Sequence, residues 1–219
     1  MDRTQWKQER RLWNEVRMDT LDARQYDERW GSYINPTHTI MVERFLSLCP
    51  PQGHILDAAC GTGKYWSLLL ERGFSVVGTD QSRQMLQRAH DKFLHIPVEH
   101  INLQELVFFD MFDGVMCMDA MENVFPEDWP LVLKNFVNVL HPDGHVYLTV
   151  EMETDEELRI AYDAGKRLSL PLIYGEYAHH GGYHYYPTDE QVRGWLAEAL
   201  LSILDIVEGD GYRHYLTKK

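Results

Sequence analysis

The chain contains 219 residues, and its 34 acidic and 21 basic side chains give a formal net charge of −13. We expect neither nucleic acid nor anionic membrane as a partner, because both attract basic surfaces. Hydrophobic residues make up 44% of the sequence, enough for a sizeable core, and the three cysteines form no CxxC pair. With no disulfide pattern, signal peptide or membrane-spanning run in view, the sequence predicts a cytoplasmic protein.

The first 36 residues are predicted to form a helical cap on a main domain at 37–219. Residues 4–24 carry a narrow apolar stripe among many charges, which is typical of one or two amphipathic helices. A stretch rich in aromatic residues follows at 26–36, and a helix is expected over 37–48. We expect the cap and the main domain to form a single globular unit.

From residue 54 onward, predicted strands and helices alternate. Strands are expected at 54–58, 75–79, 97–101, 113–118 and 145–150, and helices at 64–72, 82–94 and 127–140. Alternation at this spacing indicates right-handed crossovers between parallel strands, with helices on both faces of the sheet.

The last third of the chain has a different pattern. A helix is expected over 155–170, an irregular loop over 171–187 and a helix capped by Thr188 up to about 200. Two final strands, 202–208 and 212–217, are joined by an Asp-Gly pair that predicts a hairpin. The expected fold class is therefore α/β, with a doubly wound, Rossmann-like, seven-stranded sheet that is mostly parallel and ends in an antiparallel hairpin strand.

A turn with two glycines, Gly61 and Gly63, follows the first predicted strand. Glycine allows unusual backbone angles and a close ligand approach, and the next helix N-terminus attracts polar or anionic groups. A dinucleotide fingerprint needs a third glycine where this chain has Trp66, which disfavours a dehydrogenase. Asp57 precedes the turn and Asp80 ends the second strand. Two carboxylates beside this turn, which we call the ligand corner, favour a ligand that has ribose hydroxyls and a positive charge.

Five segments, in order along the chain, resemble the motifs of the class I S-adenosylmethionine-dependent methyltransferases. They are Leu56–Gly63 (LDAACGTG), Val77–Ser82 (VGTDQS) followed by Met85 and Leu86, Asn102–Leu106 (NLQEL), Phe112–Cys117 (FDGVMC) and Leu140–Leu148 (LHPDGHVYL). The resemblance extends over residues 26–219. The chain departs from the family pattern at Ala59, where glycine is usual, and at Asn102, where aspartate is common.

The resemblance implies that S-adenosyl-L-methionine is the cofactor. It implies that Asp80 holds the ribose hydroxyls and that Asn102, with the Leu103 amide, recognises adenine. The full set of cofactor-binding residues expected on this basis is Tyr26, Trp30, Asp57, Ala59, Gly61, Gly63, Asp80, Gln81, Met85, Asn102, Leu103 and Met118.

The methyl acceptor is expected beyond the C-terminal ends of the strands, where ligands bind in open α/β sheets. Candidate catalytic residues are His180, His184 and Asp119, a histidine being a possible general base. Candidate pocket residues are acidic, aromatic or imidazole side chains, namely Glu122, Tyr174, Glu176, Tyr177, His179, Tyr183 and Tyr185. Alternatively, the loop at 174–186 is a packed aromatic lid. In the same way, Asp119 and Glu122 are alternatively acidic residues at a helix N-terminus that interact favourably with the helix dipole. No metal site is predicted, because the histidine spacing matches no zinc signature.

Two functions are compatible with these observations. The first is a methyltransferase that moves a methyl group to an oxygen or nitrogen of a small molecule by in-line displacement, acting as a monomer or homodimer. The second is a non-catalytic protein that binds S-adenosylmethionine or S-adenosylhomocysteine and acts through partners. The intact Gly61, Gly63 and Asp80 fit both functions.

Overall fold

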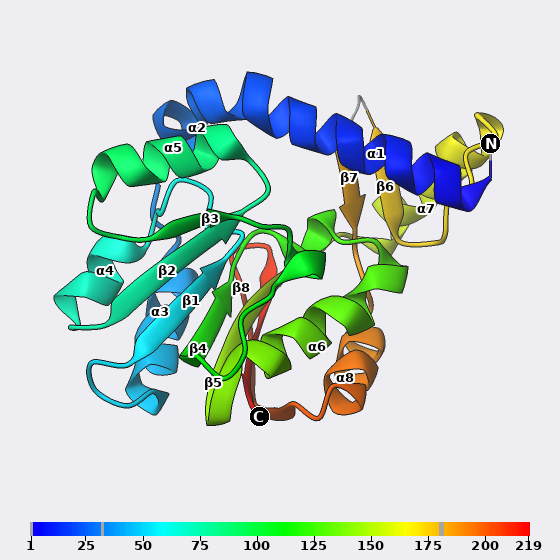
Figure 1. The fold of residues 1–219 in the computed structure, drawn as a ribbon. Coiled ribbons are helices and arrows are strands. Elements are labelled where there is room, and N and C mark those ends of the chain that lie inside the picture. The colour runs from blue at the N-terminus through cyan, green and yellow to red at the C-terminus, as the bar shows by residue number, and fades with distance from the viewer. Residues whose placement is uncertain (1, 32, 180–181) are drawn as a thin grey trace.

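A seven-stranded sheet forms the centre of the computed structural model, which describes residues 2–31, 33–179 and 182–219 (Figure 1). Its strand order is β3-β2-β1-β4-β5-β9-β8. The strands are β1 (His54–Ala58), β2 (Ser75–Asp80), β3 (Val98–His100), β4 (Phe112–Cys117), β5 (Leu140–Glu151), β8 (Ser202–Gly209) and β9 (Tyr212–Lys218). Strand β9 is antiparallel to β5 and β8, while β1 to β5 pair in parallel. The predicted fold class is confirmed.

Helices cover both faces of this sheet (Figure 1). One face packs on α3 (Pro36–Leu48), α4 (Trp66–Glu71) and α5 (Arg83–Lys92), and the other on α6 (Trp129–Val139) and α8 (Asp189–Glu198). Two separate cores result because strand side chains alternate: Ile55 belongs to the core beneath α3, and Leu56 to the core beneath α6. Among the described residues, no helix combines the length and apolar character needed to span a membrane.

The segment predicted as an irregular loop at 171–187 instead contains a second, two-stranded sheet. Helix α7 (Asp155–Arg167) leads into β6 (Glu176–His179), which pairs antiparallel with β7 (Gly182–Tyr185). The prediction was wrong because the aromatic pattern of β7 has the two-residue period of a strand. Tyr183 and Tyr185 are each 1% exposed, whereas the residues between and before them are half-buried.

The N-terminal residues form α1 (Arg3–Arg17), a π-helical turn η1 (Met18–Asp22) and α2 (Ala23–Trp30). Figure 1 shows α1, in dark blue, running along one side of the molecule from the β6–β7 hairpin toward α5. Trp6 is 1% exposed and packs edge-on against Phe125 and Tyr183. The separation into a cap at 1–36 and a main domain at 37–219 stays a prediction.

Arg3 anchors the start of α1 to the β6–β7 hairpin. Its Nη1 and Nη2 atoms donate to the two carboxylate oxygens of Glu176 at 2.7 and 2.6 Å. Glu176 is fully buried and also accepts from the Tyr183 hydroxyl at 2.7 Å and from the backbone N–H of Ile173 at 2.7 Å. Because each oxygen of this buried carboxylate has two donors, its charge is compensated only while α1 is in place.

We predict that Arg3→Met lowers the free energy of unfolding by about 3 kcal/mol, because it leaves the Glu176 charge buried without its cation. Chemical denaturation of both proteins measures the difference. Arg193→Met is the matched control, since Arg193 pairs with Asp189 at a site where the arginine side chain is 51% exposed. It should cost about 0.5 kcal/mol. Equal effects of the two changes would contradict the anchoring role of Arg3.

Candidate active site

The turn between β1 and α4 has an unusual backbone that Trp66 holds in place. Ala59, Gly61 and Gly63 have φ values of 60°, 54° and 72°, in the left-handed region. A Cβ on Gly63 would lie 2.7 Å from the Trp66 indole, and a Cβ on Gly78 of β2 would lie 2.4 Å from it. The indole therefore occupies the space between the turn and β2. In a dinucleotide fingerprint a third glycine leaves this space empty, so that the helix packs closely on the strand.

Two buried carboxylates lie at this corner. Asp80 accepts from the Gly61 N–H at 2.9 Å and from the Ser82 N–H at 2.8 Å, and Asp57 accepts from the Trp66 indole N–H at 2.7 Å. Burial raises the pKa of Asp57 to about 7, with the hydrogen bond from Trp66 opposing the rise and the Asp80 charge adding to it. Burial also raises the pKa of Asp80, against its two backbone hydrogen bonds. Both groups would be stabilised as anions by a cationic ligand.

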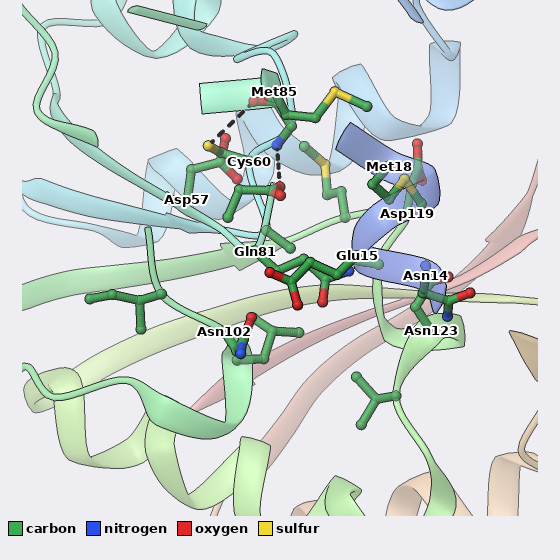
Figure 2. A pocket seen from close by; sticks show the side chains of 18 of the residues that line it. Asn14, Glu15, Met18, Asp57, Cys60, Gln81, Met85, Asn102, Asp119 and Asn123 are labelled. Atoms are coloured by element: carbon green, nitrogen blue, oxygen red, sulfur yellow. Dashed lines mark hydrogen bonds between the residues drawn. The ribbon is translucent and has the colours of Figure 1, made fainter. Parts of the chain in front are cut away.

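A cavity of about 180 Å³ opens in front of this corner (Figure 2). Most of the predicted cofactor residues line it, namely Tyr26, Asp57, Ala59, Gly61, Asp80, Gln81, Met85, Asn102, Leu103 and Met118. Gly63 is not among the lining residues and instead packs on Trp66, and the Trp30 side chain lies outside the described part of the structure. A Cβ on Gly61 would meet no protein atom within 4 Å, so the backbone there is open to a ligand.

The residues of this cavity fit an adenosyl ligand. Asp80 has carboxylate oxygens that could accept from ribose hydroxyls. Asn102 and Leu103 have polar side-chain and backbone groups, and Met85 has a polarisable surface. Leu103 opens the 3₁₀ turn η2 (Leu103–Glu105), and Asn135 of α6 holds this turn by donating to the Leu103 carbonyl at 2.9 Å. The turn is thus fixed before a ligand arrives.

Asp119, two residues beyond β4, is the predicted catalytic residue that lines the cavity. Its φ is 52°, and its backbone N–H donates to the Thr149 hydroxyl at 2.9 Å. One carboxylate oxygen lies 2.8 Å from Nε2 of His38, a histidine that is fully buried. His38 thus fixes the direction of the Asp119 carboxylate, and no motif in the sequence indicated this pair.

The other predicted acceptor residues that are described do not line the cavity. Glu176, Tyr183 and Tyr185 belong to the buried core, because Glu176 neutralises Arg3 and both rings pack among aromatic side chains.

The remaining predicted acceptor residues that are described also lie away from the cavity. Tyr174 is exposed and its hydroxyl donates to Asp155 at 2.5 Å, and Tyr177 lies on β6 of the β6–β7 hairpin. His184 Nδ1 lies 2.9 Å from Glu151, and Glu122 is buried in the 3₁₀ turn η3 (Met121–Asn123). His179 is the last residue of β6, and its side chain lies outside the described part of the structure, as does the whole of His180.

Comparison with known proteins identifies the family. A family model described as a methyltransferase domain matches residues 55–144. A candidate methyltransferase of Geobacillus sp. strain WCH70 is 30% identical over 186 residues, which cover 69% of this chain and 75% of that protein. The chain belongs to the class I S-adenosylmethionine-dependent methyltransferase family.

Other methyltransferases are similar to shorter parts of this chain in sequence, or to most of it in fold. YqeM of Bacillus subtilis strain 168, a candidate methyltransferase, is 36% identical over 125 residues, covering 54% of this chain and 49% of YqeM. The chain thus spans about half the length of several curated relatives that it matches. In fold it is similar to 1,6-didemethyltoxoflavin-N1-methyltransferase of Burkholderia thailandensis, with a TM-score of 0.71, 18% identity and coverage of 94% and 88% of the two chains.

Several cavity residues of this methyltransferase-family chain were not predicted. Four come from the N-terminal segment, namely Arg11, Asn14 and Glu15 of α1 and Met18 of η1, and Figure 2 shows the last three at the cavity. The others include Lys64, Tyr65, Asn123 and Val124. The amphipathic pattern of residues 4–24 predicted the helix. It could not show that the polar residues Asn14 and Glu15 face a ligand cavity, because that depends on how α1 docks on the sheet.

Asp57 should make the stability of the cofactor-free protein fall as the pH rises from about 4 to 7. Across this range the unfolded chain, with its carboxyl pKa of 3.8, loses the proton while the folded protein retains it. Asp57→Asn should remove this term, of roughly 4 kcal/mol, and raise stability at pH 8. Denaturant titrations at pH 5 and pH 8 measure it. Asp91→Asn, an exposed change on α5, is the control, and an unchanged pH dependence in Asp57→Asn would contradict the assignment.

Proposed function

We propose that this chain binds S-adenosylmethionine in the cavity and catalyses methyl transfer to an oxygen or nitrogen of a small molecule. The observation that carries the proposal is the corner itself: Asp57 and Asp80 flank an open left-handed turn, and Gly61 presents bare backbone to the cavity. Two buried carboxylates suit a ligand that combines ribose hydroxyls with positive charge, and they oppose one that carries a pyrophosphate.

Specific residues would hold each part of the cofactor. Asp80 would accept from the ribose hydroxyls with the free lone pairs of oxygens that Gly61 and Ser82 already orient. Asn102 and Leu103 would contact the adenine edge, and Met85 would pack on its face. When bound, S-adenosylmethionine supplies a methyl group on a sulfonium sulfur that is a good leaving group.

The residues of the chain would position the acceptor and keep water away from the cofactor. Asn14, Glu15 and Met18 border the cavity from α1 and η1, so that this part of the N-terminal segment would exclude water from the cofactor. Asp119, fixed by His38, would orient the acceptor in line with the methyl group. A small acceptor is supported by the Burkholderia thailandensis neighbour, which was solved with a small molecule, 1,6-didemethyltoxoflavin.

The direct test of this function is methyl transfer by the purified chain. S-adenosylmethionine carrying a labelled methyl group is incubated with panels of small amines, phenols and carboxylates, and labelled product is measured together with S-adenosylhomocysteine. Label transfer to a member of these panels supports the proposal. Tight binding of S-adenosylhomocysteine with no transfer to any panel would favour the second function, a non-catalytic binding protein.

Asp80→Ala should weaken S-adenosylhomocysteine binding at least tenfold, because hydrogen bonds from the ribose hydroxyls to a carboxylate are worth about 1.5–3 kcal/mol. Isothermal titration calorimetry measures the affinity. Asp80→Asn serves as a second variant, since it retains an acceptor for the Gly61 N–H, and Asp91→Asn is the surface control. Wild-type affinity in a folded Asp80→Ala protein would remove the ribose assignment.

A further inference from the structure

One positive charge lines the cavity without a carboxylate partner. The two basic residues among the described lining residues are Arg11 and Lys64. Arg11 forms an ion pair with Asp128, the last residue of the 3₁₀ turn η4 (Pro126–Asp128). No described residue forms an ion pair or a hydrogen bond with the ammonium of Lys64, which is half-buried. Folded proteins seldom bury a lysine without a counter-ion, because the lost hydration is then not replaced.

The packing of neighbouring residues limits where the Lys64 ammonium can lie. Lys64 is followed by Tyr65 and Trp66, whose side chains are buried, so the backbone at the start of α4 is held in place. The Nζ atom lies 5.6 Å from the ring centroid of Tyr33 and 5.8 Å from that of Tyr65. The Tyr65 ring is in turn stacked on the buried ring of His38, with the centroids 6.1 Å apart. Aromatic rings attract a cation without neutralising it, so the ammonium keeps its charge for a ligand.

The acidic residues of the cavity do not account for this cation. Asp80 accepts from two backbone N–H groups, Asp57 accepts from the Trp66 indole, and a carboxylate oxygen of Asp119 lies 2.8 Å from His38. Burial lowers the pKa of Lys64, and the Asp119 charge opposes this change. A ligand that carried only positive charge would be repelled by Lys64. We therefore expect a ligand of this cavity to carry an anionic group as well.

The anionic group that suits this position carries a single negative charge. Asp57 and Asp119 line the same cavity (Figure 2), as does Asp80. A phosphate ester carries between one and two negative charges at neutral pH, and the additional charge would be repelled by these carboxylates. A carboxylate carries one charge, which the one ammonium of Lys64 balances.

We propose that Lys64, framed by Tyr33 and Tyr65, is a carboxylate-binding subsite of the cavity. The inference rests on the proposed function, and it adds a chemical group that a ligand of the site must carry. Two ligands of a methyltransferase could bring the carboxylate: the cofactor, through its amino-acid end, or an acceptor that is itself a carboxylic acid. In both cases the Lys64 ammonium contacts a carboxylate oxygen, and a ligand without this group binds less tightly.

The first arm of the test measures the cofactor. S-adenosylhomocysteine and its decarboxylated analogue, which lacks only the carboxylate, are titrated by calorimetry into wild type and Lys64→Met. If the cofactor brings the carboxylate, S-adenosylhomocysteine should bind wild type about tenfold or more tightly than the analogue does, as expected for a charge-assisted hydrogen bond. Lys64→Met should lose this preference. It should bind the decarboxylated analogue at least as tightly as wild type does, which also shows that the variant is folded.

The second arm measures the acceptor. Small carboxylic acids, each paired with its neutral primary amide, are titrated into the complexes of the same two proteins with S-adenosylhomocysteine. If the acceptor brings the carboxylate, the wild-type complex should bind an acid about tenfold or more tightly than its amide. Lys64→Met should lose this preference while its affinity for S-adenosylhomocysteine stays at the wild-type value.

Two further variants control both arms. Lys64→Arg retains a cation on a long side chain and should retain the preference for the carboxylate. Lys134→Met is the matched control, because Lys134 is exposed on α6 and does not line the cavity. It should match wild type in every titration.

The outcomes distinguish this inference from the function on which it rests. A preference for the carboxylate that Lys64→Met loses supports the subsite, and the arm in which it occurs identifies the ligand. If wild type shows no such preference in either arm, or if Lys64→Met retains it, the subsite is overturned and the cofactor cavity stands. If neither S-adenosylhomocysteine nor its decarboxylated analogue binds, the proposed function fails and this inference fails with it.

Discussion

The packing of one indole ring controls the geometry of the ligand corner. Trp66 lies against Gly63 and Gly78 with no room for a Cβ on either, and its N–H donates to Asp57. The turn therefore has to pass through left-handed backbone angles, which leaves Gly61 open to the cavity and brings its N–H to Asp80. A smaller residue at position 66 would free the turn, remove the donor to a buried carboxyl and alter the proposed cofactor contacts at Gly61 and Asp57.

The sheet and this corner were predictable because they are local in sequence. Strand periodicity, the two glycines and the strand-end Asp80 are all visible within short windows, and the mostly parallel sheet followed from the alternation of strands and helices. The ion pair of Arg3 with Glu176 joins residues 173 positions apart, and the contact of His38 with Asp119 joins residues 81 apart. No pattern encodes such pairings, so Glu176 was assigned to a pocket, and the part of the N-terminal segment that borders the cavity was missed.

Buried negative charge links the two halves of the site. Asp57 and Asp80 flank the turn, Asp119 and Glu122 lie beyond β4, and burial raises the pKa of Asp57, Asp80 and Glu122. The folded chain thus holds several carboxyl groups in a state that cationic ligands would stabilise. A sulfonium cofactor bound at the turn would offset part of this charge.

The central claim is that the corner at Trp66 binds the adenosyl part of the cofactor. A crystal structure of the chain with S-adenosylhomocysteine tests it most directly. The account predicts that both ribose hydroxyls lie within about 3.2 Å of the Asp80 carboxylate, with adenine between Met85 and Asn102 and the sulfur facing the side of the cavity that holds Asp119. A ligand bound elsewhere, or a ribose with no contact to Asp80, would contradict it.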